Sequence, residues 1–180
     1  MRDEHAAGIL LTVGGIQFLI MMLVAETIYP SYSVSKNYIS DLGVGRTALL
    51  FNISIILLGL LIILSGYLLR SFYLPLFPVF FLAGLGAALV GIFPENTGEI
   101  HSLSALLVFA MGGIATYFIL ARVRSVLSLI WAVLGTIGLA ALALFAAGHY
   151  LGLGPGGMER MIAIPELLML ISFGAYLDSH

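Results

Sequence analysis

From Thr47 to Leu69 the chain reads TALLFNISIILLGLLIILSGYLL, 23 residues without a single charge. A helix of about 20 mostly apolar residues is long enough to cross the hydrocarbon core of a bilayer. The stretch therefore predicts a transmembrane helix. Strands of an outer-membrane barrel alternate apolar and polar residues, and the absence of that alternation here favours a helix.

Five further stretches have the same length and apolar character. The six predicted spans are Ala6–Tyr29, Thr47–Leu69, Phe72–Phe93, Ile100–Ala121, Val126–His149 and Met158–Tyr176. No A-x-A cleavage site follows the first of them, so it is interpreted as a retained helix and not a signal peptide. The sequence thus predicts an all-α integral membrane protein, with residues 1–180 forming a single domain that is a bundle of six transmembrane helices.

The composition agrees with this prediction. Of the 180 residues, 61% are hydrophobic and 9% are charged, and the mean hydropathy is +1.14. Soluble domains are about 45–50% apolar and about 25% charged, so an ordinary cytosolic enzyme and a disordered chain are excluded. Seven Lys and Arg against nine Asp and Glu leave no basic patch for a nucleic acid. The lack of cysteine excludes disulfides, thiolate catalysis and cysteine-bound metals.

Six spans place both termini on the same side of the membrane. That side carries Arg2, Arg70, Arg122 and Arg124, and the opposite side carries Lys36, Arg46 and Arg160. Cytoplasmic loops are enriched in Lys and Arg, and the short connection that holds Arg122 and Arg124 gives the strongest signal. We therefore expect a multi-pass protein of the cell membrane with both termini in the cytoplasm.

The three connections on the opposite side, residues 30–46, 94–99 and 150–157, are longer and more polar than those on the terminal side. Ionisable residues gather in and beside them. An ionised side chain at the centre of a bilayer costs about 2.5–3.5 kcal/mol on insertion scales, so each such residue needs an interface, a partner or a function. The residues that need an explanation are Glu26, Asp41, Glu95, His101, His149, Glu159, Arg160 and Glu166.

Asp41, Glu95 and His101 are the predicted catalytic residues. Asp41 has two interpretations, a solvated helix cap or an inward-facing acid, base or metal ligand. Glu95 has no evident local structural role. His101 lies in the first turn of a predicted helix, where the helix dipole disfavours the charged ring, and a neutral imidazole is a good base or metal ligand.

A metal site is a related hypothesis. Asp41, His101 and His149 together provide enough ligands for a divalent metal such as zinc with one open position. The sequence contains no H-E-x-x-H motif, so these ligands would have to come from three separate segments. Acid–base chemistry with a metal and acid–base chemistry without one both remain open at this point.

A second group of residues is predicted to bind the ligand. Glu159 and Arg160 open the last span, and Glu166 lies two turns deeper on the same helix face. Glu166 is costly to bury, and Arg160 is poorly phased for an ion pair within the same helix, so we expect the partner of Glu166 on another helix. Glu26 lies at a similar depth. In this interpretation Arg160 holds an anionic lipid head group. The predicted ligand-binding residues are Asn37, Ser40, Glu26, Glu159, Arg160 and Glu166.

Three short motifs relate the chain to a known family. They are NYISDLG at 37–43, FPE at 93–95 with His101 following, and GMER at 157–160. On these motifs the chain resembles the domain of unknown function 998 family of bacterial and archaeal membrane proteins. The family pattern has proline after the motif asparagine, where this chain has Tyr38. The resemblance implies a prokaryotic six-helix membrane protein with a polar site, and it implies no established reaction.

Three function classes follow from these residues. The first is a hydrolase or transferase that acts on lipid at the outer leaflet. The second is a non-catalytic accessory subunit or lipid-binding scaffold, whose partners would be membrane lipid and other membrane subunits. The third is a small proton-coupled transporter that uses Glu26 and Glu166, because ionisable residues inside a membrane often form proton pathways.

Overall fold

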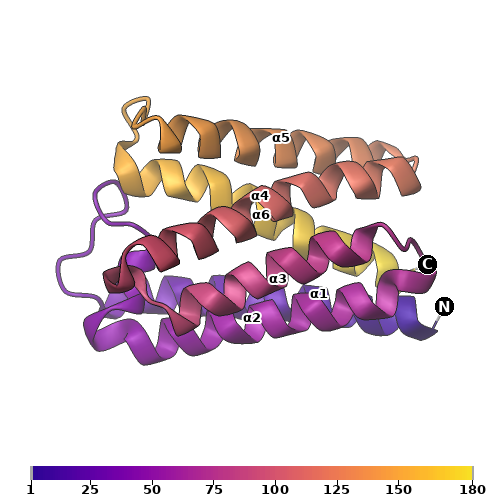
Figure 1. Cartoon of the computed structure of the whole chain (residues 1–180), viewed down its shortest axis with the longest axis horizontal. Helices are drawn as coiled ribbons and strands as arrows, with labels where there is room; N and C mark the ends of the chain where they lie inside the picture. The colour runs from indigo at the N-terminus through magenta and orange to yellow at the C-terminus, as the bar shows by residue number, and fades with distance from the viewer. Residues whose placement is uncertain (1, 180) are drawn as a thin grey trace.

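The computed structural model of the chain describes residues 2–179. These residues form six α-helices joined by short 3-10 turns and loops, and they contain no β-strand. The helices are α1 (Arg2–Ile28), α2 (Ala48–Leu68), α3 (Leu76–Ile92), α4 (Glu99–Arg122), α5 (Val126–Ala146) and α6 (Gly154–Ser179). Figure 1 shows one elongated bundle with both chain ends at the same end, which we call the termini end, and the longer loops at the opposite end, the loop end.

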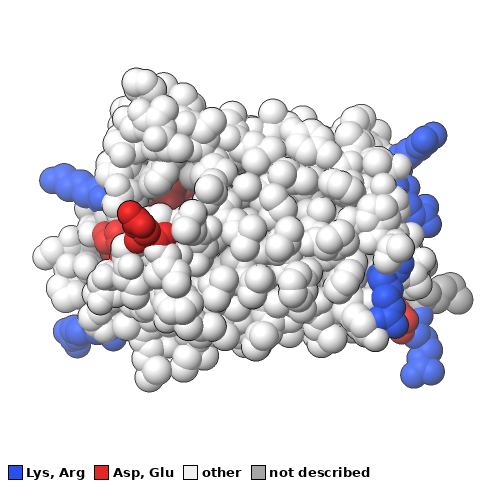
Figure 2. Space-filling view, viewed as in Figure 1, with Lys and Arg blue, Asp and Glu red and all other residues white. Residues whose placement is uncertain are grey.

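The helices have the length and composition of membrane spans. Five segments are long and apolar enough to cross a bilayer, namely Arg2–Ile28, Gly45–Ser71, Glu99–Arg122, Val126–Ala146 and Gly154–Ser179. The remaining helix, α3, is equally apolar but has 17 residues. In Figure 2 charged side chains gather at the two ends of the bundle and the visible face between them is uncharged. The prediction of an all-helical membrane protein is therefore confirmed.

Helix α1 begins four residues before the predicted start, at Arg2, and the starts of α3 and α6 also differ from the prediction. Proline explains the differences at α3 and α6. Helix α3 begins four residues late, at Leu76, because Pro75 restricts the backbone before it and the preceding residues form turns. Helix α6 begins four residues early, at Gly154. Pro155 lies in its first turn, where backbone N–H groups have no acceptor within the helix, so the N–H that proline lacks costs no helical hydrogen bond.

The six helices form a ring. Each helix packs against its neighbours in the chain, and α6 closes the ring by packing against α1. Helices α4 and α5 meet in their middle and termini-end parts, where Tyr117 and Thr136 share a hydrogen bond of 2.8 Å between their hydroxyl oxygens. Toward the loop end the same two helices diverge (Figure 1). The ring is therefore open on one side, in the half that carries the polar loops.

Glycine allows the closest helix contacts in the ring. Gly59 of α2 faces Gly84 of α3, and a Cβ atom on either one would collide with the carbonyl oxygen of the other. Between lipid-facing helices there is no hydrophobic driving force, so such close backbone packing is a main source of association energy.

We expect Gly59→Ala to lower the thermal unfolding midpoint by several degrees. The added methyl has backbone on the opposing side and cannot be accommodated by a side-chain rotation, and overpacking of this kind costs about 1–3 kcal/mol. Ile53→Ala on the exposed face of the same helix is the control. Equal midpoints for the two variants in neutral detergent would contradict the packing assignment.

Candidate functional site

The loop between α1 and α2 folds over the start of α6. Arg160, which is 8% exposed, organises this contact by donating five hydrogen bonds of 2.5–3.3 Å from its two terminal nitrogens. The acceptors are the backbone carbonyls of Val34, Asn37 and Gly156, the Glu26 carboxylate and the Tyr32 hydroxyl. Both terminal nitrogens are thus directed at the loop and at α1.

This arrangement gives Arg160 and Glu26 a structural role. Their ion pair, with 2.5 Å between Nη2 and Oε1, leaves 9% and 14% of the two side chains exposed. Burial raises the pKa of the adjacent Tyr32 hydroxyl to about 12, so this group stays protonated and donates to the Tyr38 carbonyl at 3.0 Å. The head-group role predicted for Arg160 is not supported, because its guanidinium is already occupied by the protein.

Asn37 and Asp41 stabilise the fold of the same loop. Oδ2 of Asp41 accepts hydrogen bonds from the Asn37 side chain at 2.8 Å and from the Tyr38 backbone N–H at 3.0 Å. The Asn37 side-chain oxygen in turn accepts from the Ser33 N–H at 3.0 Å. Asp41 therefore caps no helix terminus, since its bonds run backward into the loop. It lies next to Glu95 and is not part of the cleft wall described below.

Glu95 is the carboxyl group that faces the open side of the ring. Partial burial raises its pKa to about 7, and a hydrogen bond and charge repulsion from Asp41 add to the rise. A hydrogen bond from the Ser40 side chain lowers the pKa of Glu95 and offsets part of this rise. With a pKa of about 7, the Glu95 carboxyl is present in both its protonated and its ionised form near neutral pH.

His101 is held in one tautomer. The ring is 7% exposed, and its Nδ1 lies 2.8 Å from the carbonyl oxygen of Phe93. A carbonyl oxygen only accepts hydrogen bonds, so Nδ1 carries the proton and Nε2 of the neutral ring has the free lone pair. The predicted role of His101 as a base or metal ligand stays a prediction, and it would use this second ring nitrogen.

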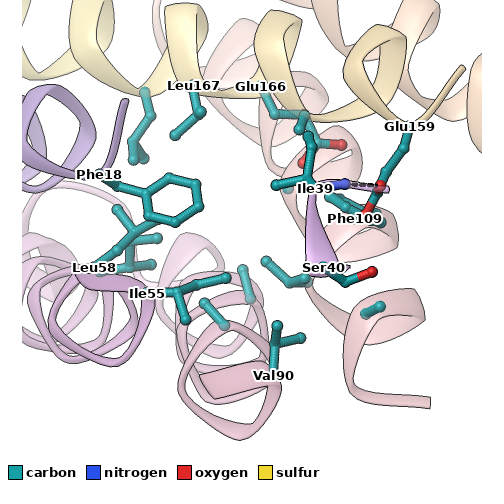
Figure 3. Close-up of a pocket in the computed structure, with 18 of the residues that line it drawn as sticks. Phe18, Ile39, Ser40, Ile55, Leu58, Val90, Phe109, Glu159, Glu166 and Leu167 are labelled. Carbon is teal, nitrogen blue, oxygen red and sulfur yellow. Dashed lines mark hydrogen bonds between the residues drawn. The ribbon is translucent and has the colours of Figure 1, made fainter. Parts of the chain in front are cut away.

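Glu159 completes the polar wall. Its side chain reaches from the first turns of α6 to the backbone N–H of Ile39, which donates to Oε2 at 2.5 Å, and the residue is 6% exposed. The dashed line in Figure 3 marks this bond, with Ser40 next to it. The loop backbone thus brings Ser40 beside a buried carboxylate of α6.

These residues line one cleft of about 500 Å³ between the diverging ends of α4 and α5. The polar side chains that line it are those of Tyr38, Ser40, Glu95, His101, Ser102 and Glu159. Its apolar walls are formed by the α4 and α5 side chains Ala105, Leu106, Phe109, Leu142, Phe145 and Ala146. Figure 2 shows acidic side chains gathered in a hollow at this end of the molecule. The structure therefore brings together Ser40, Glu95, His101 and Glu159 of the predicted site residues.

The predicted metal ligands are not brought together. Within residues 2–179 no three His, Asp or Glu side chains are grouped as a metal ion would require. His149 is exposed beyond the end of α5, and neither His149 nor Asp41 lines the cleft. The set Asp41, His101 and His149 is therefore not assembled, because the glycine-rich turn after α5 leaves His149 outside the ring.

Sequence reasoning missed several residues of the cleft. Tyr38 contributes a hydroxyl whose pKa is raised by burial and by its Tyr150 neighbour, and its ring packs on Phe145 at 5.7 Å between centroids. Phe109 and Phe145 form walls, although each one alone is an ordinary apolar residue of a span. The sequence signal for Tyr38 was its place inside the NYISDLG motif, and the two phenylalanines had no comparable signal.

The fold and the cleft define a class, an all-helical multi-pass membrane protein with an acidic, histidine-containing cleft at one end of the bundle. The comparison with protein families gives a more specific assignment. Residues 12–177 match the family described as protein of unknown function (DUF998), and the chain belongs to that family. No curated protein and no solved structure shows significant similarity to the chain.

We expect Arg160→Met to destabilise the protein strongly. It leaves Glu26 buried without its cation, and breaking a buried ion pair in this way costs about 3–5 kcal/mol. The thermal midpoint in neutral detergent measures the effect, with Lys36→Met on the exposed part of the same loop as the control. The double variant Glu26→Gln/Arg160→Met should recover part of the loss, because no uncompensated charge remains. A single variant as stable as the control would refute the structural role.

Proposed function

We propose that the cleft is the active site of a membrane-embedded hydrolase or transferase that acts on a lipid ester. The observation that carries the proposal is the shared position of Glu95 and His101 on the wall of one cleft that opens sideways between α4 and α5. The exposed side chains Leu106 and Ala146 lie at its rim, so a lipid can enter from the bilayer without leaving it.

The two groups have complementary chemistry. Nε2 of His101 accepts the proton of a water or of an acceptor hydroxyl as its oxygen attacks the ester carbonyl. Glu95, whose pKa is raised to about 7, keeps a protonated fraction near neutral pH, and in that form it donates its proton to the departing alkoxide oxygen. One proton is taken up and one is released, so the pair returns to its starting state when the proton passes from His101 to Glu95. Asp41 is a positioning residue for Glu95.

The charge of the cleft favours an uncharged head group. None of the described residues that line it is Lys or Arg, whereas Glu95 and Glu159 are acidic. An anionic phosphate would meet no cation there and would face two carboxyls. The class of substrate that fits is an ester of a neutral lipid, such as a diacylglycerol or a glycolipid.

The same proposal includes six spans and an orientation with both termini in the cytoplasm. Arg2, Arg70, Arg122 and Arg124 are exposed at the termini end. At the loop end only Lys36 and Arg46 are exposed among the described basic residues, because Arg160 is buried in its ion pair. When only exposed basic residues are counted, the excess of positive charge at the termini end is therefore larger than the sequence alone suggests. The cleft then faces the outer leaflet.

The second candidate function is a lipid-binding scaffold or an accessory subunit of a membrane complex. The bonds of Arg160, Asn37 and Asp41 favour it, since they use polar groups to hold a loop. The third candidate, a proton-coupled transporter using Glu26 and Glu166, has less support. Glu26 is paired with Arg160 and lines neither the cleft nor the cavity below it.

We expect purified protein in nanodiscs to release fatty acid from diacylglycerol, and His101→Ala and Glu95→Gln to lower the rate at least about 100-fold. The wild-type rate should fall as pH rises above about 7, because the acid loses its proton. Glu99→Gln, an exposed acid outside the cleft, is the control. Full activity of both variants, or no turnover of any neutral lipid ester, would leave the scaffold as the better explanation.

The orientation has a direct test, because the chain has no cysteine. Lys36→Cys and Arg124→Cys each create a single labelling site on an exposed residue at one end. In intact cells a membrane-impermeant maleimide should label Lys36→Cys at once and Arg124→Cys only after permeabilisation. The reverse pattern would place the cleft on the cytoplasmic side.

A further inference from the structure

Below the cleft, toward the middle of the bundle, lies a second and mostly apolar space. Its volume is about 90 Å³, and α1, α2, α3, α4, α6 and the first loop contribute to its wall. Four aromatic rings line it, those of Phe18, Phe51, Phe80 and Phe109. Figure 3 shows Phe18, Leu58 and Ile55 on one side of this cavity and Ile39, Phe109 and Glu166 on another.

Glu166 is the exceptional residue of this cavity. It projects from α6, is 9% exposed, and its Oε1 is buried without a hydrogen-bond partner. The carboxyl lies between two glycines, because a Cβ atom on Gly112 of α4 would collide with Oε2 and one on Gly138 of α5 would lie 3.2 Å from Oε1. The backbone N–H of Gly113 donates to the carboxyl. The bundle thus provides space for the carboxyl and leaves one oxygen unsatisfied.

No cation of the protein compensates this group. Among the described residues that line the cavity none is Lys or Arg, and Arg160 is directed at Glu26 instead. A carboxyl in apolar surroundings is costly when it has no cation beside it and one of its oxygens has no hydrogen-bond donor. A ligand that brings a cation with N–H groups would supply both missing interactions. The aromatic rings around the cavity add attraction for such a cation.

The cavity has an entrance. Ser40, His101, Ala105, Phe109 and Glu159 line both the cavity and the cleft, so the two spaces adjoin. Along α6 the seven residues from Glu159 to Glu166 correspond to about 10 Å. Glu159 places a second carboxyl at the start of this path. A ligand that enters the cavity from the cleft would therefore meet Glu159 first and Glu166 second.

We propose that the cavity binds the head of a lipophilic primary amine, whose ammonium group pairs with Glu166 while its alkyl chain extends through the cleft toward the bilayer. The sizes support this orientation. A cavity of about 90 Å³ has room for an ammonium group and a few methylenes, and the cleft of about 500 Å³ takes the remainder of the chain. The alkyl chain would share the cleft with the proposed substrate, but binding of the amine requires Glu166 and no reaction, so it can be tested apart from catalysis.

The test measures equilibrium binding of radiolabelled dodecylamine to the purified full chain in neutral detergent at pH 7. We expect saturable binding of one amine per protein for the wild type. Glu166→Gln, which keeps the size of the side chain and removes its charge, should weaken binding at least tenfold. Glu99→Gln removes an exposed acid at the loop end that lines neither space and should bind like the wild type. Dodecanol, with the same chain and no charge, should compete at least tenfold less well than unlabelled dodecylamine.

Two further observations make the result independent of folding and of catalysis. Gly112→Ala displaces the Glu166 carboxyl while keeping its charge, and it should also weaken amine binding. Dodecylamine should raise the thermal midpoint of the wild type and not that of Glu166→Gln. Equal affinity in wild type and Glu166→Gln, equal competition by dodecanol, or no saturable binding would each overturn the proposal. None of these results depends on turnover in the cleft.

Discussion

The buried ion pair between Arg160 and Glu26 is the interaction on which the loop end depends. It joins the start of α6 to the end of α1, and the remaining donors of the guanidinium hold the backbone of the loop between α1 and α2. A charge pair at this depth is stable only when its other hydrogen bonds are also made, and here the loop carbonyls and Tyr32 make them. The same bonds fix the loop close to α6, where Ile39 reaches Glu159.

That constraint separates the polar residues into two groups. Arg160, Glu26 and Asn37 are occupied by the fold, and Asp41 is held by the loop. Other polar side chains at this end retain unused capacity, because Nε2 of His101 and the carboxyl of Glu95 face the space between α4 and α5. Any chemistry at this end of the bundle would therefore use side chains such as His101 and Glu95, which line the cleft and do not hold the loop in place.

Glycine links the packing of the helices to this chemistry. Gly59 and Gly84 bring the backbones of α2 and α3 together, as small residues do in many membrane proteins. Gly112 and Gly138 have a different consequence, since the space that they leave is filled by the carboxyl of Glu166. Helices α4 and α5 diverge toward the loop end (Figure 1), and the cleft between them adjoins the cavity that Glu166 lines. Glycine thus allows close contact between two helices at one place and leaves room for a buried side chain at another.

The membrane class, the six helices and the clustering of polar residues in three loops could be predicted from the sequence, because apolar length and proline positions act locally. The absence of a local role also made Glu95 and His101 candidates. That Arg160 is paired, that His149 lies outside the cleft, and that Tyr38 and Phe109 line it became clear from the folded chain. Those outcomes depend on which helices are neighbours in the ring and on how far α4 and α5 diverge, and both arise from contacts between residues far apart in the chain.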